Sequence, residues 1–387
     1  MKTHDNFKDL LIAIDSSRPS KSSALELLEM ASKINYRKSI KTRNLLWEFL
    51  RITSKSNFLL ALENDESRQV WVDICLRIIQ QTNFSIKDLF EQRVNEIPNE
   101  TYFLDMSGPA KTAWSYSNIW IYIKKIATVM DKYSSEKPRV AIISDNCVDG
   151  AACDLAALSF NYLVSPLSSH FSDEVFIDIF QKLDINVVIT DSATRMKKLL
   201  KIRKQASLGF NIFVFEQGRK ALPSGCYHLG KECSRISNDE IKNFLSDHKQ
   251  EKIGKVATIM FTSGSTGLPK GVSFSNYNLV SKRFCRGAAL PKVGKQELLI
   301  CYLPLFHTFG RFLEMMGMLY WRGTYVFTGN TSPETLMKLF SELNPTGFIS
   351  IPLRWKQLYE KSMDSINESD NEEEIQEARL SLCLYAR

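Results

Sequence analysis

The sequence predicts an α/β protein with a largely parallel sheet, and three observations lead to this fold class. Short apolar runs alternate with amphipathic helical patterns from about residue 85 to residue 262, an order typical of βαβ units. The first 84 residues contain mainly helical patterns. With 387 residues, 44% hydrophobic and 24% charged, the chain is long enough for roughly two to three domains with a substantial core. We therefore divide it into a helical extension, residues 1–84, and an α/β part, residues 85–387.

The helical extension carries no motif that predicts chemistry. Ser22 or Ser23 is suited to cap a helix whose apolar residues then recur at helical spacing. Residues 45–52 and 70–79 show similar amphipathic patterns. Two interpretations of this region stay open, a docking module for a partner and a helical cap on the main domain.

The α/β part is expected to alternate regularly between strands and helices. Short apolar runs predict buried strands, and the periodic segments between them predict helices. A further helix is expected to begin near Ser275. The expected strands cover residues 139–144, 162–167, 185–190, 210–215 and 256–261, and the expected helices cover 87–94, 118–133, 150–160 and 173–183.

Charge and composition exclude several classes of protein. The net charge of +7, from 50 basic and 43 acidic residues, is too mild for a dedicated nucleic-acid binder. Residues 195–204 (RMKKLLKIRK) are strongly basic. They fit either a patch for anionic lipid or phosphate, or a solvated helix face, and we favour the solvated face. Cys226, His228 and Cys233 fit no zinc spacing. The start of the chain lacks a signal-peptide pattern and no apolar run reaches the length of a membrane span. We expect a cytoplasmic protein, with peripheral membrane contact left open and no nucleic-acid partner.

The segment TSGSTGLPKG, residues 262–271, directly follows an apolar run. Its glycines permit backbone conformations in which amide N–H groups converge, its hydroxyls can bond phosphate oxygens, and its lysine adds a compact positive charge. It is not a Walker A loop, because proline precedes the lysine and glycine follows it. The residues of this candidate polyphosphate loop are Thr262, Ser263, Gly264, Ser265, Thr266, Gly267 and Lys270.

TSGSTGLPKG resembles the signature phosphate loop of the adenylate-forming superfamily, which includes acyl-CoA synthetases. Residues 151–167, 302–312 and 348–359 resemble further segments of that family in the same order, the last one a segment of its long-chain branch. Where the family often has glycine, this chain has Asn161. The resemblance covers residues 85–387. It implies the stacked, helix-flanked, mostly parallel sheets of the family's large N-terminal domain, here incomplete.

The resemblance also implies roles for individual residues. The loop would hold the β- and γ-phosphates of ATP, and Ser265 would help to hold Mg²⁺. His307 would act as a catalytic residue between the nucleotide and the carboxylate, although a structural histidine is the alternative. Phe306, Phe309 and Arg311 would line or border the acyl pocket, with core packing and a plain surface arginine as their alternatives.

The implied reaction joins a carboxylic acid to AMP from ATP and then forms a thioester with CoA. The resemblance to the long-chain branch of the family implies that the acid is a fatty acid. A carrier-protein thiol as acceptor and a non-catalytic nucleotide-binding pseudoenzyme are the alternatives. This chain lacks the family's histidine in the run SNYNL, residues 275–279. The family's adenine segment, ribose-binding aspartate and C-terminal lysine domain have no match in the sequence. We therefore expect residues 1–387 alone to form no acyl-CoA.

Overall fold

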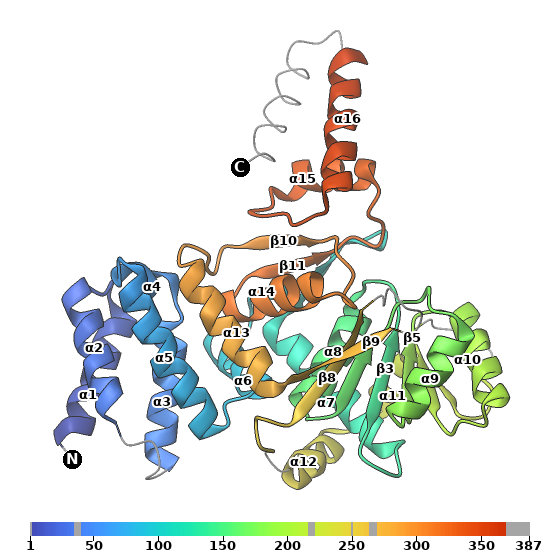
Figure 1. Ribbon diagram of the computed structural model, residues 1–387, viewed down its shortest axis with the longest axis horizontal. Coiled ribbons are helices and arrows are strands. Elements are labelled where there is room, and N and C mark those ends of the chain that lie inside the picture. The colour runs from blue at the N-terminus through green and yellow to red at the C-terminus, as the bar shows by residue number, and fades with distance from the viewer. Residues whose placement is uncertain (1, 35–39, 216–220, 249–250, 263–268, 369–387) are drawn as a thin grey trace.

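The structure, a computed structural model, describes residues 2–34, 40–215, 221–248, 251–262 and 269–368. Two sheets flanked by helices form its α/β part, and a group of helices precedes them (Figure 1). This arrangement confirms the predicted fold class. No described helix has the length and apolar character needed to cross a membrane.

Five helices make up the first part of the chain. They are α1 (Lys2–Ser16), α2 (Lys21–Lys33), α3 (Ile40–Thr53), α4 (Ser56–Ala61) and α5 (Asp65–Thr82). The expected cap of α2 is wrong by two or three positions, because Ser20 is the N-cap. Ser23 is instead the third helical residue, and its hydroxyl accepts a bond from the Ser20 N–H at 3.0 Å while Ser20 caps the Ser23 N–H. This reciprocal capping box satisfies two backbone donors, which one serine alone would not do.

The larger sheet has the strand order β7-β6-β5-β3-β4-β8-β9. All neighbouring strands are parallel except β8 and β9, so six strands present their carboxyl ends at one edge. All five expected strands are confirmed within this sheet. The strands are β3 (Arg139–Ile143), β4 (Leu163–Pro166), β5 (Val187–Thr190), β6 (Asn211–Val214), β7 (Cys226–His228), β8 (Val256–Thr262) and β9 (Lys270–Ser275).

Helices cover both faces of this sheet and form two separate cores. On one face α7 (Tyr116–Lys132) and α8 (Val148–Ser159) join the main core, and on the other α9 (Asp173–Lys182) and α10 (Ala193–Gln205) form a second one. Nearly every residue of α8 is buried, because its alanine-rich sequence allows close packing on all sides. The short helices α11 (Leu229–Arg235) and α12 (Asn238–Asp247) connect β7 to β8.

The smaller sheet has the order β10-β11-β1-β2. Its strands come from both ends of the α/β part: β1 (Thr101–Asp105), β2 (Thr112–Ser115), β10 (Leu298–Cys301) and β11 (Thr324–Phe327). Flanking helices are α6 (Ile86–Glu96), α13 (Asn276–Ala289), α14 (Met316–Trp321), α15 (Pro333–Leu343) and α16 (Pro352–Glu368), the last two at the top of Figure 1. Ser275 caps α13, which confirms the expected helix start.

A cluster of buried and partly buried charges connects the first helices to the rest of the chain. The Glu96 carboxylate accepts bonds from Arg322 Nε at 2.8 Å, Arg93 Nη1 at 2.9 Å and Arg51 Nη1 at 3.4 Å. Arg322 also donates to the Arg51 carbonyl at 2.8 Å and to the Ser54 hydroxyl at 3.2 Å. We call Glu96, Arg51, Arg93 and Arg322 the seam cluster, since it joins α3 to α6 and α14.

Candidate active site

The β8–β9 hairpin places the two ends of the candidate phosphate loop side by side. Thr262 is paired with Lys270 in the ladder, and its hydroxyl donates to the Lys270 carbonyl at 3.4 Å. Both side chains are exposed. The predicted residues between them, Ser263, Gly264, Ser265, Thr266 and Gly267, lie outside the described residues. The loop therefore starts at the carboxyl end of β8, beside β4.

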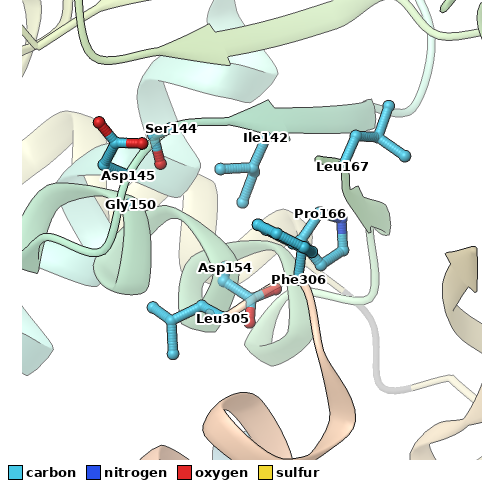
Figure 2. Close-up of a pocket in the computed structure, with 9 residues that line it drawn as sticks. All are labelled: Ile142, Ser144, Asp145, Gly150, Asp154, Pro166, Leu167, Leu305 and Phe306. Carbon is cyan, nitrogen blue, oxygen red and sulfur yellow. The ribbon is translucent and has the colours of Figure 1, made fainter. Parts of the chain in front are cut away.

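A small cleft lies at the same edge of the sheet, where β3 and β4 end. Figure 2 shows Ser144 and Asp145 at one side of it and Pro166 and Leu167 at the other, with Phe306 below. Because β3, β4 and β8 are parallel neighbours, this cleft and the phosphate loop share one edge. The full lining is Ile142, Ser144, Asp145, Gly150, Asp154, Pro166, Leu167, Leu305 and Phe306.

The segment after β10 brings predicted site residues to this cleft. Asn146 anchors it, because its amide donates to the Leu303 carbonyl at 2.9 Å and its oxygen accepts from the Leu305 N–H at 2.9 Å. Phe306 then lines the cleft. His307 is exposed, and its imidazole makes no hydrogen bond to a described residue. A buried structural histidine is therefore excluded at this position.

Phe309 and Arg311 lie in different surroundings. Phe309 is 56% exposed and does not line the cleft. Arg311 is fully buried, so the alternative of a plain surface arginine is wrong. Its guanidinium donates to both Asp154 oxygens, at 2.7 and 2.5 Å, and to the Thr258 hydroxyl at 2.7 Å. Asp154 lines the cleft and Arg311 does not, so Arg311 influences the cleft only by holding the Asp154 carboxylate in place.

A π-helix, η1 (Phe309–Met315), carries these residues. Such helices often mark functional sites, since the wider turn redirects side chains. Gly310 is required here, because a Cβ would lie 2.5 Å from the Leu303 carbonyl oxygen. The π-helix also buries Glu314 completely. Sequence periodicity gave no signal for this local change of helical geometry.

Glu314 predicts a pH dependence of stability. Tyr325 donates to Glu314 Oε2 at 2.8 Å, whereas Oε1 has no hydrogen-bond partner. Burial raises the Glu314 pKa to about 8, above its usual 4.5. A carboxyl whose folded pKa is raised stabilises the fold fully below pH 4.5 and loses that contribution as pH rises to 8. Glu314→Gln should therefore flatten the fall in melting temperature between pH 5 and pH 8, as measured by differential scanning calorimetry. Parallel curves for the two proteins would contradict this account.

The basic segment is helix α10, and most of its charges have partners. Arg195 contacts Asp145 at 2.8 Å, and Arg203 donates to the Ser224 carbonyl at 2.8 Å. Lys198 and Lys201 also have an acidic partner. This pairing favours the interpretation as a solvated helix face. Among the described residues, no group of His, Cys, Asp and Glu is arranged to hold a metal ion.

Comparison with known proteins shows the family. The model of the family described as AMP-binding enzyme matches residues 90–385. Long-chain-fatty-acid–CoA ligase ACSBG2 of Xenopus laevis is 23% identical over 288 residues, which cover 72% of this chain and 38% of the relative. Long chain acyl-CoA synthetase 8 of Arabidopsis thaliana is 29% identical over 244 residues, which cover 59% of this chain and 33% of the relative. Thus the chain spans less than half the length of these relatives.

Comparison with solved structures shows a similar fold. The crystal structure of ATP-bound MatB from Rhodopseudomonas palustris matches with a TM-score of 0.57 and 19% identity, covering 70% of this chain and 50% of that one. Helices on both faces of a mostly parallel sheet place the chain in the α/β class of folds. Within that class, this chain belongs to the AMP-binding enzyme family.

Proposed function

We propose that this chain supplies the ATP- and acid-binding part of an enzyme that activates a carboxylic acid with ATP to form acyl-AMP, and then transfers the acyl group to the thiol of CoA. The observation that supports this most strongly is the common edge of the phosphate hairpin and the Phe306 cleft. A carboxylate in the cleft would lie beside phosphates held by the hairpin. The names of the relatives support a long-chain fatty acid as substrate.

Each described residue of the site has a role in this proposal. Lys270 is exposed and forms no ion pair with a described residue, so its ammonium is available to a phosphate. Its charge would offset negative charge that develops on the leaving pyrophosphate. His307 is free to donate to a carboxylate or phosphate oxygen, and Phe306 would cover the apolar part of the acid. Asp154, held by Arg311, would shape the floor of the cleft.

Mg²⁺ would accompany ATP in this reaction and neutralise part of the phosphate charge. The described residues offer no ligand cluster of their own for it. We propose that the hydroxyl of Ser265 assists, together with phosphate oxygens of the nucleotide. No step of the proposed chemistry by the chain's own residues depends on that contact.

Replacing Lys270 with alanine tests the phosphate role. In the full-length protein, Lys270→Ala should slow ATP–pyrophosphate exchange with palmitate by ten- to about a hundredfold. The reason is the loss of a charge-assisted contact of about 1.5–3 kcal/mol. The exposed Lys282 on α13 supplies a matched control, and Lys282→Ala should exchange at the wild-type rate. Unchanged exchange in Lys270→Ala would refute the phosphate role, and exchange that no fatty acid supports would refute the substrate class.

A further inference from the structure

A second cavity lies near the amino-terminal end of β8, whereas the phosphate loop follows the carboxyl end of the same strand. Its volume is about 260 Å³, whereas one water needs roughly 10–15 Å³. Ile253, in its lining, precedes β8, and the phosphate loop follows β8. A strand of seven residues places the two sites roughly 20 Å apart. We call this second site the rear cavity. Its walls come from α3, α6, the end of α8, the start of α13, and three residues near the end of α12, His248, Glu251 and Ile253.

Buried polar atoms in the rear cavity lack hydrogen-bond partners. Ser159 and Asn276 are 2% and 4% exposed, and neither Ser159 Oγ nor Asn276 Oδ1 has a partner. The amide nitrogen of Asn276 donates to Asn161 Oδ1 at 3.1 Å, so its oxygen is the atom left without a bond. His248 Nε2, in the same lining, is also unpartnered. A buried polar group without a hydrogen bond is unfavourable, and a polar ligand that bonds to it would remove that penalty.

Charges of both signs line the rear cavity and are incompletely paired. The Arg43 guanidinium lies 4.9 Å from the centre of the Trp47 ring, forms no ion pair with a described residue, and its Nε lacks a hydrogen bond. The Glu91 carboxylate lies 3.9 Å from Lys87 Nζ, beyond hydrogen-bond distance. Burial raises the pKa of Glu91, although its side chain remains 41% exposed. Among the described residues, two cations of the lining, Arg43 and Lys87, and one anion, Glu91, thus have no ion-pair partner at hydrogen-bond distance.

We propose that the rear cavity binds a small zwitterion, a molecule with an ammonium group and a carboxylate or phosphate group. Arg43 and the Ser159 hydroxyl can donate to the oxyanion, while Glu91 and Asn276 Oδ1 can accept from the ammonium. A ligand with one charge would leave the opposite charge of the cavity unpaired. An apolar ligand would leave all four groups unsatisfied.

Binding there would join the helical extension to the α/β part, because Arg43 lies on α3 and Ser159 and Asn276 lie on α8 and α13. A ligand that binds only the folded chain raises its melting temperature in proportion to the logarithm of its concentration. Such a ligand would therefore stabilise the packing of α3 against the α/β part. This effect is independent of the nucleotide site.

The test is a titration of the purified chain by calorimetry and thermal unfolding. Glycine, L-serine and phosphoethanolamine serve as zwitterions, and acetate, inorganic phosphate and methylammonium serve as controls whose charge has a single sign. At least one zwitterion should bind and raise the melting temperature, and the controls should not. Ser159→Ala and Glu91→Gln should each weaken that binding at least tenfold. Arg235→Gln, a surface control, and Lys270→Ala should leave it unchanged.

Three results would overturn the proposal. The first is that no zwitterion binds, which would mean that the cavity holds water alone. The second is equal binding by wild type, Ser159→Ala and Glu91→Gln. The third is binding that Lys270→Ala or ATP abolishes, which would place the ligand in the nucleotide site. Ser159→Ala removes a hydroxyl that has no partner, so its fold should survive and keep the comparison valid.

Discussion

Arg311→Met is expected to lower the free energy of unfolding by about 3–5 kcal/mol, because it strands a buried carboxylate. Arg311 and Asp154 are 0% and 4% exposed and share two hydrogen bonds. Without the guanidinium, the Asp154 charge would have no counter-ion and little water. Urea denaturation followed by tryptophan fluorescence measures the change. Because Asp154 lines the cleft, the same variant should also weaken acid binding.

Two controls separate the ion pair from general damage to the core. The double variant Arg311→Met/Asp154→Leu removes both charges, and it should recover most of the lost stability. Arg235→Gln removes a guanidinium whose side chain is 70% exposed, and it should change stability by no more than about 0.5 kcal/mol. A double variant as unstable as Arg311→Met would contradict the stranded-charge explanation.

Glu96→Gln should have the second large effect, again a loss of about 3–5 kcal/mol in the free energy of unfolding. The substitution keeps the size of the side chain but removes the negative charge from among three arginines. It should also loosen the first helices from α6 and α14. Limited proteolysis should then cut within residues 2–82 sooner in the variant than in wild type. Glu29→Gln, on α2 and 68% exposed, removes a carboxylate outside the seam cluster and is the matched control.

The seam cluster also predicts a response to acid. Burial by itself raises the Glu96 pKa, but the charges of Arg322, Arg93 and Lys55 outweigh it and lower the pKa to about 2 from the usual 4.5. A depressed folded pKa gives stability that is present above pH 4.5 and is lost as pH falls to 2. Wild type should therefore lose more stability than Glu96→Gln between pH 5 and pH 3. Equal losses would show that Glu96 contributes no acid-sensitive stability.

Much of the fold could be predicted from the sequence because buried parallel strands form continuous apolar runs. RVAIIS and INVVIT became β3 and β5, and each expected strand lies in the larger sheet. All four strands of the smaller sheet were missed, although β1, β10 and β11 are as long as confirmed strands of the larger sheet. β9, KGVSFS, is an exposed edge strand without an apolar run, and only its pairing with β8 identifies it. No local pattern could show that β1 pairs with β11, since more than 200 residues separate them.

The departure from the family pattern at Asn161 has a local physical reason. Asn161, where the family often has glycine, has a φ of 58° in the turn between α8 and β4. Asparagine is among the few residues that tolerate this left-handed conformation, so the substitution preserves the turn.

The sequence also could not show that Arg311 is buried. Its partner Asp154 lies 157 positions away on α8, within a segment that reads as an ordinary apolar helix.

The candidate site was predicted as a set of residues, and the structure brings part of that set together. Thr262 and Lys270 are paired on the hairpin, and Phe306 lines the neighbouring cleft. Asp154 and Asn146 were missed. Neither belongs to the phosphate-loop motif, and each acts through contacts with the segment from Leu303 to Arg311. A polar residue in an otherwise apolar helix, such as Asp154 in α8, is the signal that could have found one of them.

A calorimetric titration of the purified chain with ATP shows whether the β8–β9 hairpin binds the phosphates of a nucleotide. Wild type and Lys282→Ala should bind ATP with the same affinity, and Lys270→Ala should bind it at least tenfold more weakly. Failure of the wild-type chain to bind ATP, or equal binding by Lys270→Ala, would contradict the account.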